Sequence, residues 1–139
     1  MKTREPGLGM DQKMRLLVVD DSPIDRLLLT RVLGNAFPEA TLRVVGSTKI
    51  EFQAALEDDE YDLLVADYSL GWADGFEVMR SVRQRWPDCR AILFTVMPSD
   101  RLFGQAVSAG FDACLTKSSS LEPLTVAVEG ALARSGKLY

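Results

Sequence analysis

Five short, largely apolar stretches recur along the chain, and a segment with helical spacing of apolar residues follows each of them. These stretches lie at 16–19, 41–45, 62–67, 91–95 and 111–116. A short apolar run is typical of a strand that is buried on both faces, as in a parallel sheet. Strands that alternate with helices favour right-handed crossovers, with helices on both faces of the sheet. The sequence therefore predicts an α/β fold.

Capping residues indicate where the predicted helices begin and end. Ser22 is a suitable N-cap for the first helix, Thr48 for the second and Ser119 for the last. A third helix is predicted over about 76–86 and a fourth over Ser99–Gly110, where glycine can adopt the left-handed conformation of a C-cap.

The length and composition of the chain fit a single domain. The chain has 139 residues, of which 47% are hydrophobic and 26% are charged, as in ordinary globular proteins. We interpret residues 1–13 as a loose polar leader, 14–135 as the folded domain, and 136–139 as a frayed end or the start of a linker.

The composition disfavours several kinds of partner and compartment. The net charge is −4, whereas nucleic-acid binding needs a basic surface, so we expect no nucleic-acid binding by this chain alone. The sequence has neither an apolar stretch of about 20 residues nor a signal-peptide core, so we expect no membrane association and no export. Its 2 cysteines form no disulfide framework, which favours a reducing, cytoplasmic location. Because the chain has no histidine, any phosphoryl group must come from another molecule.

Reactive polar side chains lie at or just after the ends of four of the predicted strands. Asp20 and Asp21 follow the first strand, and Asp67 and Thr95 end the third and fourth. Lys117 follows the fifth strand, and the carboxyl ends of parallel strands meet at one edge of a sheet, so we expect these groups to lie together. Three carboxylates held close together either raise the pKa of one of them or recruit a cation, and oxygen ligands without histidine or thiolate favour Mg²⁺. An aspartate nucleophile beside a metal, an ammonium and a hydroxyl indicates phosphoryl transfer to an aspartate.

The sequence resembles the receiver domain of two-component response regulators over about residues 14–135. The resemblance rests on "VVDDSP", "DLLVADYSLGWADG", "AILFT" and "GFDACLTK", which occur in the family's order and at its usual separations. It implies a flavodoxin-like (βα)5 sandwich, with a parallel five-stranded sheet of order 2-1-3-4-5 and helices on both faces.

The resemblance also assigns roles to residues of the predicted site. It implies that Asp67 is the phosphoacceptor. Asp21 would bind Mg²⁺ directly, and Asp20 would act mainly through a metal-bound water. Asp67 itself and the backbone carbonyl of Ser69 would complete the protein's share of the coordination.

The function implied by the resemblance is that of a Mg²⁺-dependent phosphoacceptor switch. Such a protein catalyses its own phosphorylation and dephosphorylation and is not a turnover enzyme. The donor would be a sensor histidine kinase or a phosphotransfer protein. Thr95 and Lys117 match the family's switch hydroxyl and lysine, and would move toward the phosphoryl oxygens. The face made by the fourth helix, the fifth strand and the fifth helix would then bind a downstream output partner or domain, or form a homodimer.

Three departures from the commonest form of the family bear on the site. Gly71 stands where proline is frequent, which is expected to loosen the loop after the phosphoacceptor. Val96 replaces a small residue, and is expected to crowd the phosphoryl site and slow hydrolysis. Cys114 stands where many receivers carry a switch aromatic, for which Phe111 or Phe103 can substitute in packing.

Other interpretations of the sequence stay open. The chain is also consistent with a pseudo-receiver that binds partners without phosphorylation, or with an N-terminal receiver from a larger sensory or kinase protein. A haloacid-dehalogenase-type phosphatase also uses an aspartate and Mg²⁺, but it needs an Asp-x-Asp motif where this chain has Asp20 and Asp21. Asp74 is interpreted as a helix-start residue, and Trp72 as a loop residue that can contact a partner.

Overall fold

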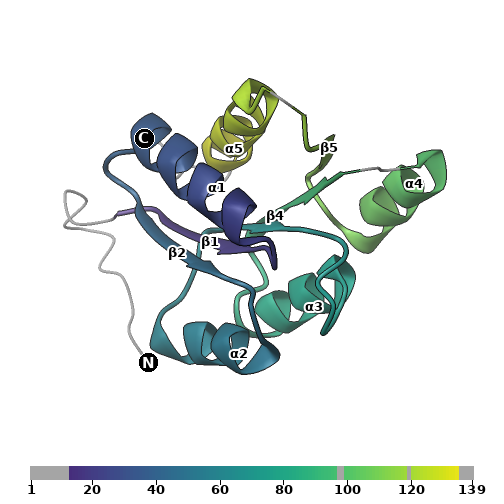
Figure 1. The fold of residues 1–139 in the computed structure, drawn as a ribbon, viewed down its shortest axis with the longest axis horizontal. Coiled ribbons are helices and arrows are strands. Elements are labelled where there is room, and N and C mark those ends of the chain that lie inside the picture. Colours follow the sequence, from purple (N-terminus) through teal and green to yellow (C-terminus); the bar gives the residue numbers. More distant parts are fainter. Residues whose placement is uncertain (1–12, 97–98, 119, 135–139) are drawn as a thin grey trace.

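The computed structural model describes residues 13–96, 99–118 and 120–134. Within these residues, five strands form one parallel sheet in the order β2-β1-β3-β4-β5 (Figure 1). The strands are β1 (Arg15–Val19), β2 (Thr41–Val45), β3 (Leu63–Ala66), β4 (Arg90–Thr95) and β5 (Ala113–Thr116). The predicted flavodoxin-like order is therefore confirmed.

A helix follows each of the five strands in the described part of the chain. The helices are α1 (Pro23–Ala36), α2 (Lys49–Asp58), α3 (Gly75–Arg85), α4 (Asp100–Ala109) and α5 (Glu122–Arg134). Helices α1 and α5 cover one face of the sheet, and α2, α3 and α4 cover the other (Figure 1). Among the described residues, no helix combines the length and the apolar character that crossing a membrane requires.

Alternate residues of β1 pack into two hydrophobic cores. Leu17 and Val19 face the core under α2, α3 and α4, whereas Leu16 and Val18 face the core under α1 and α5. None of these side chains is more than 1% exposed. Full burial of an aliphatic side chain contributes about 1.5–3 kcal/mol, so β1 is firmly anchored at the point where its acidic residues begin.

The predicted helix caps that lie within the described residues form. Three hydroxyls each accept a hydrogen bond from a backbone N–H in the first turn of the helix that follows, and they belong to Ser22, Thr48 and Ser99. The carboxylate of Asp74 does the same for α3, which confirms its interpretation as a helix-start residue. Gly110 ends α4 with a φ of 107°, the left-handed conformation expected of it. The predicted cap Ser119 lies outside the described residues.

Strands β3 and β5 start later than the apolar pattern predicts, by one and two residues. At β3, the carboxylate of Asp62 accepts a hydrogen bond from the backbone N–H of Arg15 at 2.8 Å. At β5, the carboxylate of Asp112 accepts one from the backbone N–H of Ala91, also at 2.8 Å. In both cases an aspartate just before the strand bonds to a neighbouring strand through its side chain as well as its backbone.

Candidate functional site

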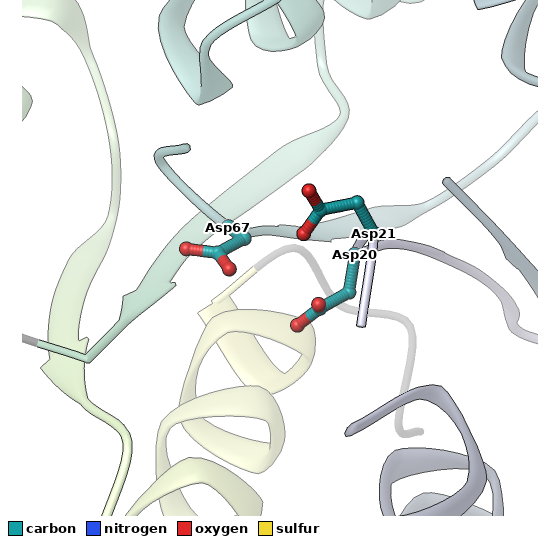
Figure 2. A group of neighbouring side chains, drawn as sticks. All are labelled: Asp20, Asp21 and Asp67. Atoms are coloured by element: carbon teal, nitrogen blue, oxygen red, sulfur yellow. The ribbon is translucent and has the colours of Figure 1, made fainter. Parts of the chain in front are cut away.

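The carboxyl ends of β1 and β3 bring three carboxylates together. Asp20 and Asp21 directly follow β1, and Asp67 directly follows β3, its neighbour in the sheet. One carboxylate oxygen of each residue lies within 4.8 Å of the other two, and Figure 2 shows the three side chains at this edge. Asp20 and Asp67 are buried, at 1% and 8% exposure, whereas Asp21 is exposed. The acids that were expected to meet here do so.

The ammonium of Lys117, which follows β5, lies among carboxylates from three segments. Its Nζ is 2.7 Å from an oxygen of Asp20, 2.9 Å from one of Asp67 and 2.7 Å from one of Asp25. The side chain is only 10% exposed. The ammonium donates hydrogen bonds to Asp25 and Asp67, and Asp20 is a third acid at ion-pair distance.

Burial and charge act in opposite directions on Asp20 and Lys117. Burial raises the pKa of the Asp20 carboxyl, and hydrogen bonds from Lys117 and from the backbone N–H of Ser22 only partly offset this. Burial lowers the pKa of the Lys117 ammonium, but hydrogen bonds to Asp20, Asp25 and Asp67 outweigh it, so the net shift is upward. Lys117 is therefore a fixed positive charge at neutral pH.

The other predicted site residues lie on neighbouring segments. Thr95 is the last residue of β4 and is 7% exposed. Its backbone carbonyl accepts a hydrogen bond from the backbone N–H of Lys117 at 2.7 Å, so the two residues are fixed to each other. Ser69 lies in the loop after Asp67, and Val96, just beyond β4, is 58% exposed. The roles of the Thr95 hydroxyl, the Ser69 carbonyl and the Val96 side chain stay predictions.

Asp25 is an acidic partner of Lys117 that sequence reasoning missed. It lies in the first turn of α1, and α1 begins at the edge of the sheet where β1 ends. That placement is a signal that could have identified it, because the first turn of such a helix faces the same edge as the strand ends. An acid in a first turn is also what the helix dipole favours, so the sequence alone assigns it no partner.

The loop after Asp67 is held by Trp72. The indole Nε1–H of Trp72 donates a hydrogen bond to the backbone carbonyl of Gly46 at 2.9 Å, and its ring packs on Phe52 with the centroids 5.6 Å apart. Gly71 has a φ of 77°, which glycine adopts readily and proline cannot adopt. The departure from proline at this position thus serves a tight turn, and Trp72 packs within the domain.

Aromatic packing beside β5 comes from Phe111. Its side chain is 6% exposed, and its ring centroid lies 5.6 Å from that of Phe76. Phe76 in turn packs edge-on against Tyr68 at 5.7 Å. Cys114 is buried in the same core, as expected of a small core residue, whereas Phe103 is 36% exposed. Of the two candidates, Phe111 is therefore the one that packs in the core, and its substitution for the switch aromatic stays a prediction.

The donor set of the cluster fits a hard divalent cation. Each of the three acids offers a carboxylate oxygen, and like charges within 4.8 Å repel unless a cation balances them. Mg²⁺ prefers oxygen ligands, is bound through a few carboxylates and keeps several waters. The exposed side chain of Asp21 leaves the cluster accessible to water.

Comparison with known proteins places the chain among receiver domains. The sequence matches the family described as response regulator receiver domain over residues 16–129. It is 32% identical over 120 residues to the transcriptional activator protein ExaE of Pseudomonas putida, covering 86% of this chain and 56% of ExaE. It is 31% identical over 123 residues to the sensor protein EvgS of Escherichia coli, covering 86% of this chain and 10% of EvgS. The chain thus spans about half of one curated relative and a tenth of the other.

A solved structure agrees with these matches. The response regulator protein TrrA from Thermotoga maritima, in complex with Mg²⁺-BeF, superposes with a TM-score of 0.70 and 26% identity. The similarity covers 86% of this chain and 99% of TrrA. The family match covers β2 to β5 and all of β1 except Arg15, and it includes Asp20, Asp67 and Lys117. The chain belongs to the response regulator receiver domains of two-component systems.

Proposed function

We propose that this chain is a Mg²⁺-dependent phosphoacceptor switch, which takes a phosphoryl group onto Asp67 from a sensor histidine kinase or a phosphotransfer protein. The observation that carries the proposal is the contact between Lys117 Nζ and Asp67 at 2.9 Å, beside the acids Asp20 and Asp21. A buried carboxylate with an ammonium in contact and further acids beside it has the groups that phosphoryl transfer to an aspartate needs.

The carboxylates of Asp20, Asp21 and Asp67, with the backbone carbonyl of Ser69, would hold the Mg²⁺. When bound there, Mg²⁺ supplies positive charge opposite the phosphoryl oxygens. The structure of the relative TrrA is a complex with Mg²⁺-BeF, and beryllofluoride imitates a phosphoryl group. This likeness and the oxygen-only donor set support the choice of Mg²⁺.

The transfer step uses the carboxylate and the donors around it. An oxygen of Asp67 attacks the phosphorus of a phosphohistidine, and the new P–O bond forms as the P–N bond breaks. The electron pair of the broken bond leaves with the imidazole, which takes up a proton. Lys117 exchanges its hydrogen bond to Asp67 for one to a phosphoryl oxygen, and the Thr95 hydroxyl donates to another. The switch is reset when water attacks the same phosphorus: the P–O bond to Asp67 breaks, Asp67 leaves as a carboxylate, and inorganic phosphate is released as the water gives up a proton to solvent.

The output face would be formed by α4, β5 and α5. Phosphorylation adds about −1.5 to −2 charges, and Thr95 and Lys117, which respond to them, end β4 and follow β5. Apolar side chains are exposed on the adjoining helices: Phe103 at 36%, Val107 at 68% and Val126 at 63%. Such exposure supports docking of an output partner, an output domain or a second copy of the chain. The signal passes because that partner binds the phosphorylated form more tightly.

Mass spectrometry after treatment with acetyl phosphate and Mg²⁺ tests the proposal. Wild type is expected to gain a labile phosphate, and Asp67→Asn is expected to gain none. Because some receivers accept phosphate only from a kinase, Mg²⁺-dependent binding of beryllofluoride, followed by NMR, is the second arm. If wild type neither gains phosphate nor binds beryllofluoride, the chain is a pseudo-receiver and the proposal is wrong. Turnover of small phosphoesters would favour a phosphatase instead.

A further inference from the structure

The ammonium of Lys117 has one partner outside the three-carboxylate cluster. Asp20 and Asp67 belong to that cluster, whereas Asp25 lies in the first turn of α1. Asp25 Oδ2 lies 2.7 Å from Lys117 Nζ, as close as the oxygen of Asp20. This distance is typical of a charge-assisted hydrogen bond. The start of α1 and the end of β5 are therefore joined directly across the site.

Asp25 presents its carboxylate from a fixed part of the chain. Its backbone N–H donates to the hydroxyl of the N-cap Ser22 at 3.2 Å. The next residue, Arg26, donates from its guanidinium to the backbone carbonyl of Asp20 at 2.8 Å. These bonds hold the first turn of α1 against the end of β1, and a side chain on such a rigid element positions its partner well. The side chain of Asp25 is 30% exposed, whereas that of Lys117 is 10% exposed.

We infer that Asp25 is a positioning residue for phosphoryl transfer. Its carboxylate keeps the ammonium of Lys117 in place while Asp20 and Asp67 exchange their contacts with Lys117 for other partners. The inference rests on the function proposed for Asp67. During transfer, an oxygen of Asp67 forms the bond to phosphorus, and Asp20 would help to hold Mg²⁺, so both acids would give up their contacts with Lys117. Asp25 takes part in neither change, and its contact with Lys117 is the one that persists.

A purely structural role for Asp25 is separable from this one. An acid in the first turn stabilises a helix through the helix dipole, and that effect does not involve Lys117. A positioning role instead requires that loss of the Asp25 carboxylate changes the behaviour of the Lys117 ammonium. Measurements on the ammonium itself therefore distinguish the two roles.

NMR of the lysine ammonium groups in the metal-free protein tests the contact without phosphoryl chemistry. In wild type, the protons of the Lys117 ammonium are expected to exchange slowly with water, since the ammonium lies among three acidic partners. Asp25→Ala should speed this exchange roughly fivefold, the factor that corresponds to one net hydrogen bond. Asp25→Asn keeps an acceptor oxygen and should speed it less. The matched control is Glu77→Ala, since Glu77 is an exposed acid in the first turn of α3. Unchanged exchange in Asp25→Ala would overturn the inference.

The rate of phosphorylation at saturating Mg²⁺ tests the positioning role. Asp25→Ala is expected to lower this rate roughly fivefold, with Asp25→Asn between Asp25→Ala and wild type, and with a smaller change in Mg²⁺ affinity than in rate. A rate equal to or above that of wild type would refute the inference, and so would a loss seen only as weaker Mg²⁺ binding. If wild type itself takes no phosphate, the proposed function fails, while the NMR result on Lys117 still decides whether the contact exists.

Discussion

Replacing Lys117 with methionine removes the cation that contacts two buried carboxylates. The side chains of Asp20 and Asp67 are 2% and 9% exposed, and Lys117 Nζ lies 2.7 Å and 2.9 Å from their oxygens. Methionine has a similar length and no charge. In the metal-free variant, these acids therefore lose their shared positive partner, and the folded state is expected to be less stable.

The size of this loss follows from the burial of the acids. Removing one partner of a buried ion pair costs about 3–5 kcal/mol. Asp21 is exposed beside the pair, so water reaches the cluster, and we expect a value near the lower end, about 3 kcal/mol. Domains are stable by about 5–15 kcal/mol, so the variant should still fold. Mg²⁺ should restore about half of the loss or more, because it binds the folded state and no longer competes with the ammonium for the same oxygens.

Urea denaturation followed by circular dichroism, in EDTA and in saturating Mg²⁺, measures both effects. Lys49→Met is the matched control, since Lys49 is an exposed lysine at the start of α2. A loss below about 1 kcal/mol in EDTA, the range of surface ion pairs, would refute the role of Lys117 as the balancing charge. A loss that Mg²⁺ leaves unchanged would contradict the view that the ammonium and the cation use the same oxygens.

Three further predictions concern residues outside the acidic cluster. Burial raises the pKa of the Cys89 thiol from 9.0 to about 12. At mildly alkaline pH, iodoacetamide should therefore label this thiol only after the protein unfolds. Fast labelling of Cys89 in the native protein, measured by mass spectrometry, would contradict this. Since the unfolded thiol loses its proton first, this group makes the stability fall as the pH rises above 9.0. Trp72→Phe removes the hydrogen bond to the carbonyl of Gly46 and keeps a ring, so urea denaturation should show a loss of about 1 kcal/mol, and an unchanged midpoint would count against that bond. Asp112→Ala removes the acceptor for the N–H of Ala91 and two ion pairs with arginines. Thermal unfolding should therefore show that the free energy of unfolding falls by about 2 kcal/mol. A fall below about 0.5 kcal/mol would mean that the acceptor is dispensable.

Local patterns predicted most of the elements, because their causes lie within a few residues. The hydroxyl of Ser22 and the left-handed Gly110 act on their own helices, so their effects are readable in the sequence. The starts of β3 and β5 were predicted one and two residues too early, because an apolar run does not show that Asp62 and Asp112 bond to other strands through their side chains. The strand order came from the family resemblance, since nothing in an apolar run specifies its neighbour.

The candidate site was predictable to the extent that its residues follow strands. Asp20, Asp67 and Lys117 meet because parallel strands end at one edge. Asp25 comes from a helix and lies 92 residues before Lys117 in the sequence. Their contact depends on the conformations of both side chains, which no local pattern specifies. Trp72 likewise looked like a free loop residue, because its hydrogen bond to a backbone carbonyl of another loop has no local signature.

The ammonium of Lys117 arrives late in the chain. It lies 50 residues after Asp67 and 92 residues after Asp25, and a domain generally folds as a unit. The acids therefore leave the ribosome before the lysine that balances their charge in the folded domain. An unfinished or truncated chain carries the acids without their lysine. The protein would therefore become able to accept a phosphoryl group only after β5 has joined the sheet. Phosphorylation would thus report that the sheet is complete.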